Sequence, residues 1–185
     1  MPKTPARIAV CSCIVMALAQ WGKALADDSL FDPFTGFRMA QYRAPIPASP
    51  DGIESVTTGD LLELTDKSAV LVDVHPLRSF HIAEDGTWIH AMHHQTLPDA
   101  IWLPVVGWGV IEPWAEAYLG TALAHRVQRD APVVVFCQLD CWLSWNAVQR
   151  VRDLGYKALW YPGGIDDWQA AGHSLVPVEP LPLRE

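Results

Sequence analysis

Two cysteines four residues apart, Cys137 and Cys141, are the residues of this sequence best suited to chemistry. Residues 132–136, directly before them, are apolar and rich in valine, which predicts a strand buried on both faces of a parallel sheet. Apolar residues at helical spacing follow up to Gly155, which favours a helix end. This order places Cys137 at the carboxyl end of a strand and beside a helix N-terminus. Backbone N–H groups at such a position stabilise anions and lower the pKa of a thiol.

Three interpretations of this cysteine pair remain open. In the first, the pair is redox-active, with Cys137 as the attacking thiol and Cys141 as the resolving thiol. In the second, the two residues form a permanent disulfide that closes the loop between them. In the third, Cys137 acts alone as a sulfur acceptor. An oxidising compartment disfavours a resting free thiol and therefore the third interpretation.

The residues expected around the sulfur atoms come from the loop after the cysteine strand and from the end of an earlier strand. They are Asp73, His75, Gln138, Leu139, Asp140, Trp142 and Ser144. Two roles are open for His75: it orients or deprotonates the Cys137 thiol, or it is an ordinary packed histidine. Trp142 either shields the sulfur, stacks on a planar ligand or packs in the core.

Four of the seven histidines, together with Met92, lie in one irregular stretch, residues 78–95. They are His81, His90, His93 and His94. Histidine and methionine suit copper, but no carboxylate or cysteine completes a recognisable ligand set. We therefore expect a solvated polar loop and assign no metal site.

The first 26 residues have the features of a secretory signal peptide. Lys3 and Arg7 form a basic start, residues 8–18 are mainly apolar, and small residues precede a cleavage point after Ala26. The apolar segment is shorter than the about 20 residues that a membrane span needs, which disfavours an uncleaved anchor helix. We therefore expect a periplasmic protein with no membrane span after cleavage.

Cleavage changes both the charge and the cysteine content of the chain. It removes three of the 13 Lys and Arg residues and no acidic residue, so the formal net charge changes from −8 to −11. Such an acidic chain is a poor candidate for binding nucleic acid. Of the four cysteines only Cys137 and Cys141 remain, and two cysteines in an exported protein are most simply a pair.

Strands alternate with helices along residues 51–176, which predicts an α/β domain of three layers with a mainly parallel central sheet. The expected strands are 69–74, 100–103, 132–136 and 158–161. Helices are expected after Thr57 or Thr58, from Pro113 onward, after the polar loop that contains Asp140, Cys141 and Ser144, and over residues 165–171. Residues 27–50 contain four prolines and four aromatic residues, which favours an extended arm packed on the domain. Residues 177–185 are rich in proline, and we expect a loose C-terminal tail.

Several segments, in this order along the chain, resemble the rhodanese (sulfurtransferase-like) domain. They are LVDV at 71–74, LPDAIWLP at 97–104, VVVFC with its loop and helix at 133–156, and YPGGIDDWQAAG at 161–172. The resemblance covers residues 56–176 and implies a rhodanese-type fold. It also implies that Asp73 braces a loop by hydrogen bonds. Ligands of such open sheets bind outside the carboxyl ends of the strands, which agrees with the position of the cysteines.

A second resemblance extends over nearly all of the predicted mature chain, from Phe31 onward. TGFRMAQYRAP at 35–45, CQLDCWLSWNA at 137–147 and WYPGGIDDW at 160–168 are similar to an exported family with a C-x-x-x-C-W motif, associated with pyrroloquinoline-quinone-dependent alcohol catabolism. This implies, as partner, a periplasmic quinoprotein dehydrogenase or its electron carrier. The link to pyrroloquinoline quinone (PQQ) rests on resemblance alone, since no residue identifies a quinone site.

The loop departs from the rhodanese pattern. Gln138, Leu139 and Asp140 follow the first cysteine, where a Gly and an Arg or two Ser residues are usual. Related phosphatases need an Arg six places after the cysteine to hold phosphate, but Leu143 stands there. Asp140 would also repel thiosulfate or phosphate. A phosphatase is therefore not expected.

Three functions follow from these observations, in decreasing order of preference. The first is thiol–disulfide or sulfur-handling chemistry on a small sulfur or thiol substrate through Cys137 and Cys141, accessory to PQQ-dependent alcohol catabolism. The second is a non-catalytic module whose disulfide-closed loop docks a dehydrogenase, an electron carrier or a cofactor. The third is a sulfurtransferase with a persulfide on Cys137. The sequence leaves open whether the protein is an enzyme.

Overall fold

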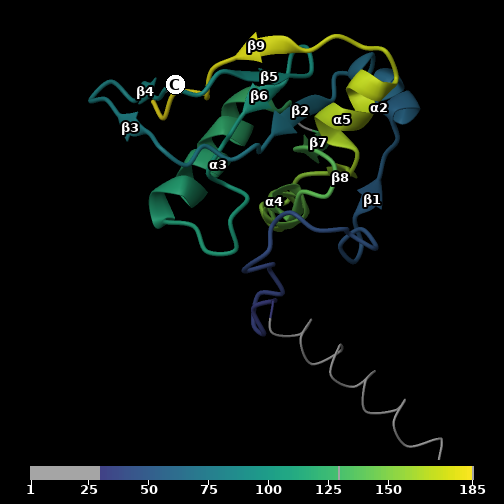
Figure 1. Cartoon of the computed structure of the whole chain (residues 1–185), viewed down its shortest axis with the longest axis horizontal. Helices are drawn as coiled ribbons and strands as arrows, with labels where there is room; N and C mark the ends of the chain where they lie inside the picture. Colours follow the sequence, from purple (N-terminus) through teal and green to yellow (C-terminus); the bar gives the residue numbers. More distant parts are fainter. Residues whose placement is uncertain (1–29, 129, 185) are drawn as a thin grey trace, which may run out of the picture.

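The structure, a computed structural model, describes residues 30–128 and 130–184. The predicted signal peptide, residues 1–26, lies outside the described residues. Five parallel strands form the central sheet (Figure 1). In spatial order they are β1 (Glu54–Ser55), β8 (Ala158–Tyr161), β7 (Val133–Phe136), β2 (Val70–Asp73) and β6 (Ile101–Trp102). The cysteine strand β7 is therefore central, with a strand on each side, which explains why all four of its residues are buried.

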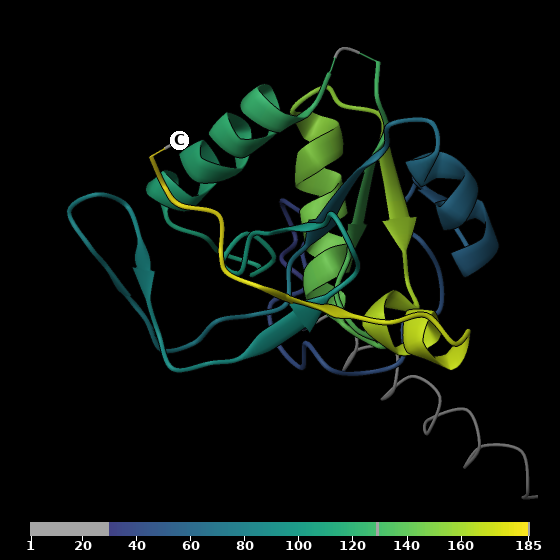
Figure 2. The same ribbon diagram turned by 90° about the horizontal axis from the view of Figure 1, so that it is seen from above.

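The pleat of the sheet sorts the strand residues into two cores. Val133 and Val135 of β7 face one core, with helices α3 (Pro113–Arg126) and α4 (Trp142–Asp153). Val134 and Phe136 face the other core, with helices α2 (Thr58–Thr65) and α5 (Gly164–Ala170). Successive side chains of a strand point to opposite faces, so one apolar run supplies both cores. Helices thus cover both faces of the sheet (Figure 2), and the predicted three-layer α/β fold is confirmed.

Local signals set the ends of the helices that flank the site. Thr57 caps α2 through a capping box with Asp60. Pro113 occupies the first turn of α3, where its missing N–H costs no hydrogen bond. Helix α4 ends at Asp153, and its C-cap Leu154 is followed by Gly155 with a φ of 88°, close to the helix end that the sequence predicts. No helix among the described residues is long and apolar enough to cross a membrane.

Two small antiparallel sheets lie outside the central one. Strands β3 (His81–Ile82) and β4 (Trp88–Ile89) pair with each other, and β5 (His94–Thr96) pairs with β9 (Val176–Val178). The stretch 78–95, expected to be irregular, therefore contains short strands.

The C-terminal tail is also ordered by contacts, contrary to the expectation that it is loose. Its backbone carbonyl at Leu181 accepts hydrogen bonds from Trp88 Nε1 at 2.8 Å and from Tyr118 Oη at 2.5 Å. The Leu181 N–H donates to the carbonyl of Trp102 at 3.0 Å. The prolines keep this segment extended, and an extended segment can pair along β5 and lie over the domain.

Candidate functional site

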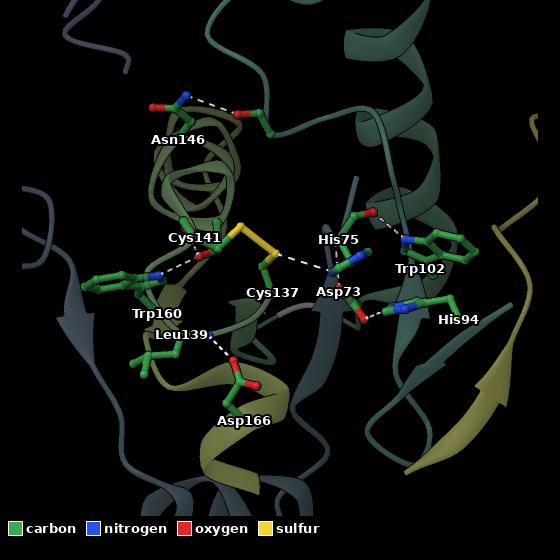
Figure 3. The surroundings of a disulfide bond; sticks show 12 residues. Asp73, His75, His94, Trp102, Cys137, Leu139, Cys141, Asn146, Trp160 and Asp166 are labelled. Atoms are coloured by element: carbon green, nitrogen blue, oxygen red, sulfur yellow. Dashed lines mark hydrogen bonds and ion pairs between the residues drawn. A yellow bond between two sulfur atoms is a disulfide. The ribbon is translucent and has the colours of Figure 1, made fainter. Parts of the chain in front are cut away.

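Cys137 and Cys141 form a disulfide at the carboxyl end of β7 (Figure 3). Their Cα atoms are 6.2 Å apart, and the exposed fractions of the two residues are 0% and 3%. Cys137 follows the last residue of the strand, but Cys141, not Cys137, is the N-cap of helix α4. Three loop residues separate the two cysteines, so the disulfide joins the end of the strand to the residue that caps the helix. The last of them, Asp140, adopts a positive φ of 59°, which turns the chain into the helix.

The sulfur of Cys137 is followed by a chain of contacts through His75, the buried Asp73 and His94. His75 Nδ1 is 4.0 Å from Cys137 Sγ. Figure 3 marks this contact with a dashed line. Asp73 is completely buried at the end of β2, and it accepts hydrogen bonds from the His75 N–H at 2.8 Å and the Thr96 hydroxyl at 2.6 Å. Its Oδ2 is also 2.7 Å from His94 Nε2. Asp73 thus braces the loop that carries His75, as the resemblance implies.

The environment of His75 favours its neutral form. Burial lowers its pKa from 6.5, electrostatic interaction with the nearby His94 lowers it further, and Asp73 acts in the opposite direction. The rings of His75 and His94 are stacked, with centroids 4.5 Å apart. A neutral imidazole can accept a proton from a thiol or donate a hydrogen bond to a thiolate. A reduced Cys137 would therefore have a neutral imidazole nearby.

Contacts with helix α5 fix the loop between the two cysteines. The Leu139 N–H donates to Asp166 Oδ2 at 2.8 Å, although the Leu139 side chain is 45% exposed. Gln138 forms an antiparallel bridge with Gly164, whose φ is 54°. A Cβ at Gly164 would meet the carbonyl of Cys137, so only glycine permits this close approach.

Ser144 lies in the first turn of helix α4, not in the loop as expected, and it has a structural role there. Its hydroxyl donates to the Cys141 carbonyl at 2.9 Å and accepts a hydrogen bond from Trp160 Nε1 at 3.1 Å. The residue is 1% exposed. Ser144 therefore connects the start of α4 to strand β8 rather than to a cavity.

The N-terminal arm, described from residue 30 onward, pairs with the cysteine loop. Arg43 forms an antiparallel bridge with Cys141, the Ala44 N–H donates to the Asp140 carbonyl at 3.1 Å, and the Trp142 N–H donates to the Tyr42 carbonyl at 3.0 Å. The sequence predicts an extended arm packed on the domain, but it does not indicate where the arm packs. One part of the domain on which it packs is the cysteine loop itself.

Trp142 contacts the arm. Its ring lies 5.4 Å from that of Phe31, and the guanidinium of Arg38 is 4.5 Å from its centroid. Trp145 lies against the same two aromatic rings. Of the roles open to Trp142, packing is therefore the one that these contacts favour.

Two open pockets adjoin the disulfide. One, of about 470 Å³, is lined by the arm, the loop and the segment after β2: Gln41, Tyr42, Arg43, Pro76, Arg78, Gln138, Cys141 and Leu143. The other, of about 460 Å³, has His75 in its wall and shares Pro76, Arg78 and Gln138 with the first. Sequence reasoning missed Arg43 and Arg78, since nothing in their local sequence marks them as neighbours of Cys141.

The four histidines expected in one solvated loop have different environments. His94 is buried against Asp73, and the His90 side chain is 4% exposed with Nε2 at 2.9 Å from Glu179. His81 and His93 are exposed. Within residues 30–128 and 130–184, no three His, Cys, Asp or Glu residues are grouped so that they could hold a metal ion. Asp73 lies 21 residues from His94, so sequence reasoning had no local signal for this pair.

Comparison with known proteins agrees with the fold. The family model for the rhodanese-like domain matches residues 57–171. No protein with a curated description shows significant similarity. Among solved structures, a protein from Bacillus halodurans is 20% identical with a TM-score of 0.44, over 66% of this chain and 76% of that one.

Two further structures match at a similar level. A rhodanese-like domain from an Anabaena species is 16% identical, with a TM-score of 0.44, over 67% of this chain and 79% of that one. A thiosulfate sulfurtransferase from Pseudomonas aeruginosa is 15% identical, with a TM-score of 0.44, over 67% of this chain but only 20% of that one. The family model spans well over half of the sequence, from the capping residue of α2 to the end of α5. The chain therefore belongs to the rhodanese-like domain family.

Proposed function

We propose that this protein carries out thiol–disulfide exchange through the Cys137–Cys141 pair. The observation that carries the proposal is the asymmetric setting of the disulfide. Cys141 lines an open pocket, whereas Cys137 is buried with His75 Nδ1 at 4.0 Å from its sulfur. A permanent structural disulfide requires neither a pocket nor a neutral imidazole beside it. Both features serve a disulfide that opens, because a thiol must reach one sulfur and the other must leave as a thiolate.

The decisive measurement is the reduction potential of the pair, determined by thiol trapping across a series of dithiothreitol or glutathione redox buffers. Structural disulfides usually lie below about −300 mV, and we expect this pair above about −250 mV. The Cys137→Ser and Cys141→Ser variants calibrate the trapping, because each has only one thiol of the pair to label. A potential below about −300 mV would refute exchange chemistry.

The burial of both cysteines supports a second candidate, a binding module with a permanent disulfide. Cys137 has no exposed surface and Cys141 is 3% exposed. In this candidate the loop and arm present a docking face, and binding of the partner survives replacement of both cysteines by serine. A sulfurtransferase with a persulfide on Cys137 has less support, because the attacking sulfur would have to be uncovered first.

The proposal includes an exported location and a partner in quinone-dependent catabolism. Its support is the signal-like N-terminus, with expected cleavage after Ala26, and the resemblance to the C-x-x-x-C-W family linked to PQQ. The partner is then a periplasmic quinoprotein dehydrogenase or its electron carrier. N-terminal sequencing of protein recovered from the periplasmic fraction tests the location, with Asp27 as the expected first residue. Recovery of uncleaved protein from the cytoplasm alone would contradict it.

A further inference from the structure

Two arginines beside the disulfide have no acidic partner among residues 30–128 and 130–184. Arg43 belongs to the arm and Arg78 to the segment after β2, and both are exposed. Within the described part of the chain, neither guanidinium forms an ion pair, and Arg78 lies over the ring of Trp108 at 5.1 Å. The formal net charge of the chain is −8. Cations without an acidic partner attract anions, even on an acidic chain.

Both arginines line the pocket of about 470 Å³ that has Cys141 in its wall. This volume falls in the range of pockets that hold small molecules, about 300–1,000 Å³. The backbone of Arg43 forms a β-bridge with that of Cys141, which holds Arg43 next to the disulfide. Arg43 also lies outside residues 57–171, so the rhodanese-like domain alone does not form this pocket.

The two cysteines differ in their access to this pocket. Cys137 is fully buried and faces His75, and Figure 3 shows its sulfur between Cys141 and the histidine. Cys141 is the cysteine in the pocket wall and the N-cap of the 12-residue helix α4. A small molecule held by the arginines therefore reaches Cys141 before Cys137.

We infer that this pocket binds small thiols that carry a carboxylate, together with their disulfides, and that Cys141 is the sulfur with which they form the mixed disulfide. The inference rests on the proposed exchange function and deepens it. It also reverses the roles that the sequence favours, since Cys141 receives the substrate and Cys137 is the resolving cysteine.

One turnover needs only the protein disulfide as oxidant and two substrate thiols as reductant. The substrate thiolate attacks Cys141 Sγ, the Cys137–Cys141 bond breaks, and Cys137 leaves as a thiolate beside His75. A second substrate thiolate then attacks the substrate sulfur of the mixed disulfide, and Cys141 leaves as a thiolate at the N-terminus of α4. Two substrate thiols are oxidised to one disulfide, and the protein disulfide is reduced to two thiols. The reverse sequence reduces a substrate disulfide.

The first test compares three thiols that differ in charge: 3-mercaptopropionate, 2-mercaptoethanol and cysteamine. The rate at which each reduces the protein disulfide is divided by its rate with 2-hydroxyethyl disulfide, which corrects for intrinsic reactivity. We expect the anionic thiol to exceed the neutral one by about tenfold and the cationic one by more, with the preference weakened by salt. Equal corrected rates would overturn the inference.

The second test removes the two charges. In Arg43→Gln/Arg78→Gln the preference for the anionic thiol should fall at least about fivefold, while Arg43→Lys/Arg78→Lys retains most of it. The matched control is Lys67→Gln/Arg152→Gln, which changes the net charge equally with exposed residues outside the pocket lining. Loss of the preference in this control as well would overturn the pocket assignment.

The third test identifies the reacting sulfur. The dianionic disulfide 5,5′-dithiobis(2-nitrobenzoate) should react at least about tenfold faster with Cys141 in Cys137→Ser than with Cys137 in Cys141→Ser. The same variants in denaturant provide the reference rates. Faster reaction at Cys137 would overturn the inference while leaving the exchange function intact. If no thiol reduces the native disulfide, the exchange function itself is refuted.

Discussion

Asn146 holds the N-terminal arm against the domain, and its replacement gives a sharp test of this structure. The side chain is completely buried on helix α4. Its Nδ2 donates to the carbonyls of Arg38 at 2.9 Å and Gly107 at 3.0 Å, and its Oδ1 accepts from the Arg38 N–H at 2.8 Å. A net hydrogen bond contributes about 1 kcal/mol, so Asn146→Ala should lower the free energy of unfolding by about 3 kcal/mol.

Asn146→Asp separates hydrogen bonding from the loss of volume. A carboxylate has the same shape but directs an oxygen, in place of a donor, at two carbonyl oxygens. The charged form should therefore cost at least about 1 kcal/mol more than alanine. Because this environment favours the protonated carboxyl, its folded-state pKa is raised. The difference in unfolding free energy between Asn146→Asp and Asn146→Ala should therefore become smaller as the pH falls toward the unfolded-state pKa of the aspartate, about 4.

Urea titration gives the free energies of unfolding, and limited proteolysis reports whether the arm has left its place. Gln149→Ala is the matched control, because Gln149 lies on the same helix and its Nε2 makes one hydrogen bond, to the carbonyl of Trp145 at 3.1 Å. A loss below about 1 kcal/mol for Asn146→Ala, with the arm still protected, would refute the assignment of Asn146 as the residue that holds the arm.

Three other predictions concern the site. The disulfide spans a sequence separation of only 4, so its loss removes only a small loop-closure entropy from the unfolded chain. A Cys137→Ser/Cys141→Ser variant should therefore lose about 2 kcal/mol of unfolding free energy in urea titrations, and a loss above about 4 kcal/mol would contradict this entropic estimate. The pKa of His75 is lowered, so below pH 6.5 the unfolded chain binds a proton that the folded protein does not. As the pH falls from 6.5, the free energy of unfolding should therefore decrease more in the wild type than in His75→Gln. Parallel plots of unfolding free energy against pH for the two proteins would contradict this. Gly164→Ala should lower the free energy of unfolding by about 2–4 kcal/mol, because φ at this position is 54° and the new Cβ meets the Cys137 carbonyl. Thermal and urea unfolding measure this, and an unchanged free energy would show that helix α5 does not approach the Cys137 carbonyl closely.

The sequence predicted the secondary structure around the cysteines well, because those signals are local. The apolar run 132–136 corresponds to strand β7, and Gly155 follows the end of helix α4. The prolines of the last residues were misjudged: they exclude a helix, but an extended segment can also pair, as β9 does with β5. Pairing of this kind depends on which edge is nearby, and no local pattern reports that.

The sequence by itself determined the parallel α/β domain and the position of Cys137 at the end of its central strand. Alternation of apolar runs with amphipathic segments encodes these features residue by residue. Only the tertiary structure decided the surroundings of the sulfur atoms. In the folded protein His94 contacts Asp73, and the arm pairs with the cysteine loop. Arg43 and Arg78 line the same pocket as Cys141. These contacts join segments far apart in the chain, and their partners are set by how the strands are ordered and how the arm folds back over the sheet.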